Sequence, residues 1–197
     1  TVKLLGDAVI TKWRSLTAAI TLDLNGKTVT IQKELPLSIS ARVIVQDSST
    51  AQTGKMYCAT ADDGISRVLD VQYRGDLIIK SGIFDGEIWA RSGNGSTLTI
   101  EGGTFNEAVA LEASASISLS GGTFKSIWYT GNSFLDLLAE GYAFYDTTGK
   151  LVNVSNNTSG YLDNVKVQEH KQHTFIDGAC ACGYTCPHTS VNADGTC

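Results

Sequence analysis

The chain has 197 residues, of which 18% are charged, and its formal net charge is −5 at pH 7. A mildly acidic surface gives no support to nucleic-acid binding, because that function needs a basic face for the phosphates. No run of apolar residues approaches the roughly 18 needed to cross a bilayer, so we expect neither a transmembrane helix nor membrane insertion.

Short apolar runs separated by turn residues make up the first part of the chain. Such runs occur at 22–24 before NGKTV, at 43–45 before QDSS, and at 69–71. They alternate with a period of two and are bounded by Gly, Asn, Asp and Ser, which predicts β-strands.

Between residues 77 and 124 one unit occurs in three copies, each an alternating apolar strand followed by a glycine turn and a phenylalanine. The copies are spaced about twenty residues apart, which is typical of stacked repeats. Aligned on the phenylalanine, they give four columns: Leu77, Leu98 and Ile117; Ile79, Ile100 and Leu119; Gly82, Gly103 and Gly122; Phe84, Phe105 and Phe124.

This repeat predicts an all-β solenoid, a parallel β-helix in which each coil completes the core of its neighbours. We expect the phenylalanines to point inward and stack, and the glycine column to permit a tight corner with positive φ. A leucine-rich repeat is excluded because the L-x-x-L-x-L pattern and the helical arm are missing. The alternative is a sandwich in which the three copies are unrelated hairpins.

A candidate binding face follows from carrying the alignment past the phenylalanines. Ile88, Val109 and Trp128 then share their inward parity, so Trp89, Ala110 and Tyr129 should point outward, with the two rings roughly 10 Å apart. Aromatic faces stack on sugar C–H groups while polar neighbours bind the hydroxyls. The alternative is that a loop, the tail or a neighbouring chain covers these rings. The candidate ligand-binding residues are Trp89, Tyr129, Glu87, Arg91 and Glu112.

The catalytic motifs of polysaccharide-cleaving β-helices are not in the sequence. A galacturonase-like site needs clustered aspartates, a Gly-His-Gly step and an Arg-x-Lys, and a lyase needs a calcium cradle of carboxylates with an arginine base. We therefore assign no catalytic residue and expect a non-catalytic module. The alternative is a carbohydrate-active enzyme, either a polysaccharide lyase or a glycosidase, or a fragment of one.

From about residue 164 the composition changes to a Cys/His-rich tail. HTFIDGAC (173–180) and HTSVNADGTC (188–197) are similar units, and thiolates and imidazoles clustered in this way suit structural, tetrahedral zinc. Disulfides and free thiols are the alternatives. The spacing at 180–183 is C-x-C-G, and the second unit stops at its first cysteine, so we expect a truncated module. The candidate zinc ligands are His173, Cys180, Cys182, Cys186, His188 and Cys197.

Several segments resemble a known class of protein when taken in chain order: TVKLLGDAVI, TLDLNGKTVTI, VIVQDSS and TIEGGTF. They are similar to the right-handed, single-stranded, pectin-lyase-like parallel β-helix regions of large Gram-positive cell-surface proteins of the gut Firmicute type. The segment at 137–152 resembles the one that closes such regions, and the Cys/His-rich end resembles a tail module that follows them. The resemblance implies a β-helix over 1–163 and a tail module over 164–197. It also implies an extracellular or cell-wall location, and a rigid scaffold or an adhesin that binds a glycan or a host surface protein.

Overall fold

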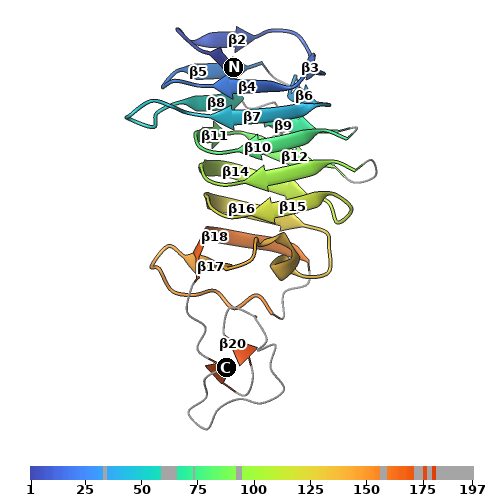
Figure 1. Cartoon of the computed structure of the whole chain (residues 1–197), viewed down its shortest axis with the longest axis vertical. Coiled ribbons are helices and arrows are strands. Elements are labelled where there is room, and N and C mark those ends of the chain that lie inside the picture. Colours follow the sequence, from blue (N-terminus) through green and yellow to red (C-terminus); the bar gives the residue numbers. More distant parts are fainter. Residues whose placement is uncertain are drawn as a thin grey trace.

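The computed structural model describes residues 1–32, 35–58, 66–72, 74–91, 95–155 and 159–170, together with the backbone of two short strands further on. Parallel strands are stacked along the long axis of the molecule, with the N-terminus at one end (Figure 1). The stack is a β-solenoid of about five turns, which confirms the predicted parallel β-helix and rules out the sandwich of hairpins.

The strands follow one another coil by coil. Their bounds are β1 Val2–Lys3, β2 Ala8–Ile10, β3 Arg14–Leu16; β4 Ile20–Asp23, β5 Thr28–Ile31, β6 Leu37–Ile39; β7 Arg42–Gln46, β8 Lys55–Cys58, β9 Arg67–Val71; β10 Asp76–Ile79, β11 Ile83–Asp85, β12 Glu87–Ala90; β13 Thr97–Ile100, β14 Thr104–Leu111; β15 Ser116–Leu119, β16 Thr123–Tyr129. The closing elements are the 3₁₀ helix η1 Phe134–Leu137, β17 Tyr142–Asp146 and β18 Gly160–Glu169, followed by β19 Phe175–Ile176 and β20 Ala179–Cys180.

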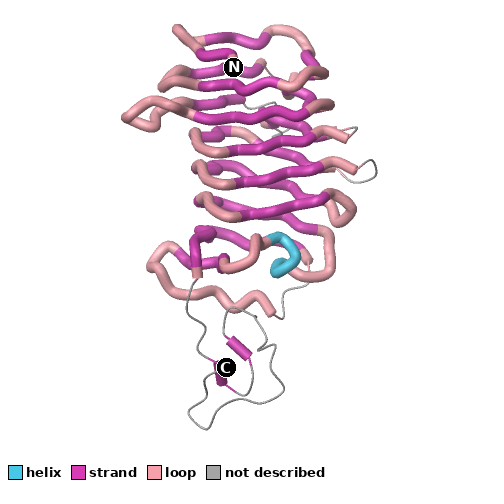
Figure 2. Tube along the Cα trace, viewed as in Figure 1, coloured by secondary structure: helices cyan, strands magenta, loops and turns pink. Residues whose placement is uncertain are grey.

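Equivalent strands of successive coils form the walls of the solenoid (Figure 2). One wall is the sheet β1-β4-β7-β10-β13-β15, the second runs β2-β5-β8-β11, and the third runs β3-β6-β9-β12. In the later coils β14 and β16 are long enough to pass through the second and the third wall, so these two walls join into one sheet. The third wall carries the candidate site.

The register confirms the repeat alignment up to the phenylalanines. Leu77 pairs with Leu98 and Leu98 with Ile117, while Phe84 pairs with Phe105 and Phe105 with Phe124. The rings stack nearly parallel, with centroids 5.1 and 4.8 Å apart, and all three side chains are buried. Such pairs contribute roughly 0.5–1.5 kcal/mol each beyond the area they bury.

The glycine column makes the corner that turns the chain into this stack. Gly82, Gly103 and Gly122 have φ values of +121°, +110° and +107°. L-residues rarely adopt this conformation, because a Cβ there meets the backbone. At Gly122 a Cβ would also lie 2.9 Å from the Phe124 ring, so glycine is needed there for space as well.

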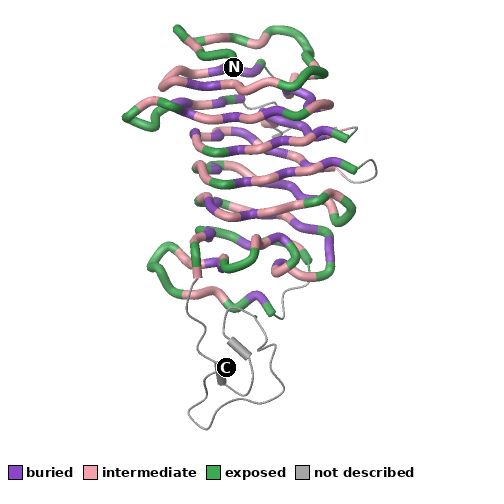
Figure 3. Tube along the Cα trace, in the orientation of Figure 1, coloured by how far each residue is buried: buried purple, intermediate pink, exposed green. Residues whose placement is uncertain are grey.

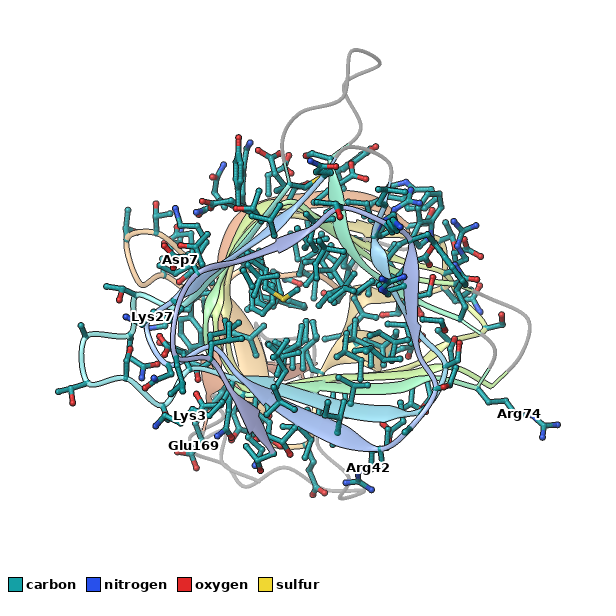
Figure 4. The ribbon with its side chains drawn as sticks, turned by 90° about the horizontal axis from the view of Figure 1, so that it is seen from above. Lys3, Asp7, Lys27, Arg42, Arg74 and Glu169 are labelled. Atoms are coloured by element: carbon teal, nitrogen blue, oxygen red, sulfur yellow. The ribbon has the colours of Figure 1, made fainter. Side chains whose placement is uncertain are left out.

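Buried apolar residues alternate with less buried ones along the strands, so the core is a continuous column inside the coils (Figure 3). Seen along the axis, charged side chains such as Arg42 and Arg74 point away from this core (Figure 4). Cys58 is buried within the core and 2% exposed, as expected for a small apolar residue.

Asp47 is a buried carboxylate that holds one corner together. Its Oδ1 accepts hydrogen bonds from the backbone N–H groups of Gly26 and Ser49, and its Oδ2 accepts from the N–H of Gly54 at 2.6 Å. Burial alone would raise the pKa of Asp47, but these hydrogen bonds outweigh it and lower the pKa below its usual value.

The C-terminal end of the solenoid is closed by an antiparallel pair. β18 pairs with β16 on one side and with β17 on the other, and its residues Val165 and Val167 are buried. This strand runs through residues 163 and 164, where the sequence predicts a boundary between the β-helix and the tail module, and it packs Val165 and Val167 against the last coil. The domain bounds stay a prediction. Within the described residues, no helix has the length and apolar character needed to cross a membrane.

Candidate functional site

The outward aromatic column of the third wall consists of Trp89 and Trp128, and Tyr129 is not part of it. Trp89 pairs with Ala110 and Ala110 with Trp128, whereas Tyr129 pairs with the buried Leu111. Tyr129 is only 6% exposed and packs edge-on against Phe134 at 5.7 Å. The predicted outward position of Tyr129 is therefore wrong by one residue.

The error arises at a β-bulge. Between the phenylalanine and the next inward residue, β14 has one residue more than β16, and the pairing shifts between Phe105 and Ala108. A shift of one residue moves every following side chain to the opposite face. Ile127, rather than Trp128, continues the inward column of Ile88 and Val109. The match of three β-branched residues, Ile88, Val109 and Ile127, was the signal in the sequence that could have found the correct register.

Two columns of side chains run along the outer face of the third wall, parallel to the solenoid axis. They follow from the pairing of β9, β12, β14, β16 and β18, in which the strands lie about 4.8 Å apart. One column is Arg67, Glu87, Ala108, Ser126 and Asp163, and the other is Asp70, Trp89, Ala110, Trp128 and Tyr161. Because their side chains are small, Ala108 and Ala110 form a depression between larger neighbours.

A shallow pocket of about 240 Å³ lies over this depression. We call it the aromatic pocket; its lining consists of Arg67, Glu87, Trp89, Ala108, Ala110, Trp128 and Tyr161. Ala108 and Ala110 are its alanine floor. Tyr161, 67% exposed, stands at the end where β18 closes the coil.

The two tryptophans lean toward each other across the alanine floor. Their backbones are two strand spacings apart, roughly 10 Å, yet their ring centroids are 6.5 Å apart in an edge-to-face arrangement. Ala110 beneath them is only 8% exposed, whereas Ala108 is half-buried. The open part of the floor is therefore at Ala108, beside Glu87.

The ring of Trp89 is held on several sides by charged groups. The guanidinium carbons of Arg67 and Arg91 lie 3.9 and 4.6 Å from its centroid, and its Nε1 donates a 2.9 Å hydrogen bond to Glu112. Cation–π contacts of this kind fix a ring in place. Trp89 therefore acts as a rigid wall of the pocket, and Trp128 and Tyr161 have more ring surface free for a ligand.

Arg91 and Arg67 share the buried carboxylate of Asp70, but unequally. Arg91 donates from Nε to Oδ1 at 2.9 Å and from its terminal nitrogen to Oδ2 at 3.1 Å. Arg67 approaches Asp70 only to 3.8 Å, which is beyond hydrogen-bonding distance. Arg91 is thus fixed by Asp70, whereas Arg67 makes no hydrogen bond to that carboxylate and lines the pocket.

Glu87 is the acidic group of the pocket. Burial raises the pKa of its carboxyl; the charge of Arg67 opposes this and that of Glu107 adds to it. Within the described residues its carboxylate has neither a hydrogen bond nor an ion pair within 4 Å. A half-buried carboxylate without a partner is costly to charge and can accept from a ligand.

Of the predicted ligand-binding residues, the structure thus brings Trp89 and Glu87 into one pocket and places Arg91 and Glu112 against Trp89. It separates Tyr129 from them. The sequence reasoning missed Arg67, Trp128, the alanine at 108, and Tyr161. Tyr161 belongs to the antiparallel closing strand, which has no counterpart in the repeat and therefore no alignment to place it.

The predicted zinc ligands lie almost wholly outside the described residues. His173, Cys182, Cys186, His188 and Cys197 are outside them, and for Cys180 only the backbone in β20 is described. His170, at the end of β18, shares a 2.6 Å hydrogen bond with the Tyr145 hydroxyl through Nδ1. Among the described residues no group of three or more metal-binding side chains is present. Zinc in the tail stays a prediction.

By its fold the chain is a parallel β-helix protein. Comparison with known proteins found no matching family model, no similar curated protein and no similar solved structure. The function proposed below therefore depends on the geometry of the aromatic pocket.

Proposed function

We propose that the chain is a non-catalytic carbohydrate-binding module, part of an extracellular or cell-wall attached bacterial protein, and that the aromatic pocket binds the glycan. The observation that carries this proposal is the pairing of Trp128 and Tyr161 beside a floor of alanines on the outer wall. Sugar rings present C–H groups that pack on aromatic faces, and small floor residues leave room for them.

The orientation of the pocket along the solenoid axis supports a linear glycan as the ligand. Trp89, Ala110, Trp128 and Tyr161 follow one another on successive strands, so the aromatic positions extend along the solenoid axis over roughly 14 Å. That length exceeds one sugar ring. A linear glycan lying along the axis would contact the rings of Trp128 and Tyr161 at once.

A glycan array tests this proposal. We expect the wild-type chain to bind at least one class of glycan, and Trp128→Ala and Tyr161→Ala each to weaken binding by tenfold or more. The matched control is Trp13→Ala, because Trp13 is a 58% exposed tryptophan on the first coil and outside the pocket. No binding by the folded wild-type chain, or equal loss in the control, would contradict the proposal.

A second candidate is a carbohydrate-active enzyme, and Glu87 is the observation that favours it. A general acid needs a carboxyl whose pKa is raised toward the working pH, and burial raises that of Glu87. The test is release of reducing ends from any glycan the chain binds. Release that stops in Glu87→Gln while binding persists would favour the enzyme; binding without release would favour the binding module.

The proposed adhesin role also includes a host surface protein as the partner. A host protein stripped of its glycans is the matched ligand for this alternative. Binding that survives removal of the glycans, and that is insensitive to Trp128→Ala, would identify a protein partner and a different surface of the solenoid.

A further inference from the structure

The aromatic pocket contains a donor and an acceptor that are not paired with each other. Arg67 and Glu87 are directly opposite on adjacent strands and both line the pocket. Within the described residues, however, no hydrogen bond or ion pair within 4 Å joins them, and the Nε of Arg67 is buried without a partner. A guanidinium can only donate and a carboxylate can only accept, so the pair offers a ligand one function of each kind.

Besides a donor and an acceptor, the alanine floor requires an apolar group on the ligand. Ala108 precedes Val109, the partner of Ile88, so it lies beside Glu87 on the neighbouring strand, and on the next strand it pairs with Ser126. Its half-buried methyl group is therefore the open apolar surface next to Glu87. A hydroxyl group placed there would lose hydrogen bonds to water without replacing them. A methyl group would gain from burial at about 25 cal/mol per Å².

Glycan substituents can be compared on these terms. A carboxylate is disfavoured next to Glu87, because the two negative charges would repel each other in the same pocket. A hydroxyl matches the donor or the acceptor but not the apolar floor. An acetamido group matches all three, since its N–H can donate to Glu87, its carbonyl can accept from Arg67, and its methyl can pack on Ala108.

We infer that the aromatic pocket selects glycans that carry 2-acetamido sugars, with the acetamido group held between Arg67 and Glu87 over Ala108. This inference rests on the proposed carbohydrate-binding function and narrows it to one ligand class. Trp128 and Tyr161 bind the sugar rings, and Arg67, Glu87 and Ala108 read the substituent at C2.

Three β1,4-linked trisaccharides that differ only at C2 test the inference by calorimetric titration of the full chain. They are the trimer of N-acetylglucosamine, its deacetylated form with ammonium groups, and the glucose trimer. We expect the acetylated trimer to bind at least tenfold more tightly than the glucose trimer. Glu87→Leu should reduce this preference to about twofold, because the acceptor is lost while the rings of Trp128 and Tyr161 remain. Glu140→Leu is the matched control at an exposed glutamate outside the pocket.

The other outcomes separate the inference from the function it rests on. Equal affinity for the acetylated and the glucose trimer would overturn the acetamido inference and leave carbohydrate binding intact. Tightest binding of the deacetylated trimer would also overturn it, since Glu87 would then be a site for cations. No binding of any trisaccharide, with binding to other glycans on the array, would overturn the inference alone; no binding to any glycan would overturn both. Ala108→Val, which fills the floor without adding charge, should lower affinity for the acetylated trimer selectively.

Discussion

Replacing Trp128 and Tyr129 with alanine, one at a time, distinguishes a pocket residue from a core residue at adjacent positions. Tyr129 is 6% exposed and packs against the buried Phe134, so Tyr129→Ala removes a fully packed ring. Truncations of this kind cost about 3–5 kcal/mol. For a chain of this size, each kcal/mol lowers the unfolding midpoint by about 2–4 °C, so we expect a decrease of roughly 6–20 °C.

Trp128→Ala should instead keep most of its stability and lose glycan binding. The ring of Trp128 is half-buried on the outer wall, and its aromatic partner is Trp89. We therefore expect the free energy of unfolding to fall by only about 1 kcal/mol, the contribution of one edge-to-face pair. Glycan binding should fall by tenfold or more. Differential scanning calorimetry and the trisaccharide titration, on both variants, give the two readouts. The register and the site would be refuted if Tyr129→Ala kept its unfolding midpoint but lost binding, while Trp128→Ala unfolded at a much lower temperature.

Three further predictions concern the coils that hold the pocket. Phe105→Ala should lower the free energy of unfolding by about 3–5 kcal/mol, and by more than Phe84→Ala, because Phe105 stacks on two rings; urea denaturation measures both. Asp47→Asn should cost about 3 kcal/mol or more, since an amide N–H would face backbone donors. The lowered pKa of Asp47 means that the stability it contributes is present at neutral pH and is lost as the pH falls through its pKa in the folded chain. Glu87→Gln should raise the unfolding midpoint near pH 7 but not near pH 4, because a raised carboxyl pKa costs stability only above the unfolded value. Equal midpoints for Glu87→Gln and wild type at both pH values would contradict the burial of Glu87.

The repeat predicted the fold because stacking makes neighbouring coils repeat the same residue types. Like residues pair with like at Leu77, Leu98 and Phe105 because each coil completes the core of the next. This correspondence extends as far as the phenylalanines, because all three copies have the same length up to that residue.

Beyond the phenylalanines the prediction of the site failed by one residue for a physical reason. A bulge adds a residue to one strand without breaking the pairing before or after it, and no local propensity at Asn106 or Glu107 indicates it. Trp89 was placed correctly because it lies before the bulge. Arg67 and Tyr161 could not be placed at all, since one follows a long connection and the other comes from the antiparallel closing strand.

The chain contains 3 tryptophans, which allows the central claim to be tested in one measurement. The indole N–H signals of Trp13, Trp89 and Trp128 can be assigned in a ¹H–¹⁵N correlation spectrum by single substitutions, and then followed during titration with the acetylated trisaccharide. Glycan binding in the aromatic pocket predicts that the signals of Trp89 and Trp128 shift together and saturate, while that of Trp13 stays in place. A saturable titration that shifts the signal of Trp13 alone, or that leaves the signals of Trp89 and Trp128 unchanged, would show that the glycan binds elsewhere. Either result would contradict glycan binding in the aromatic pocket.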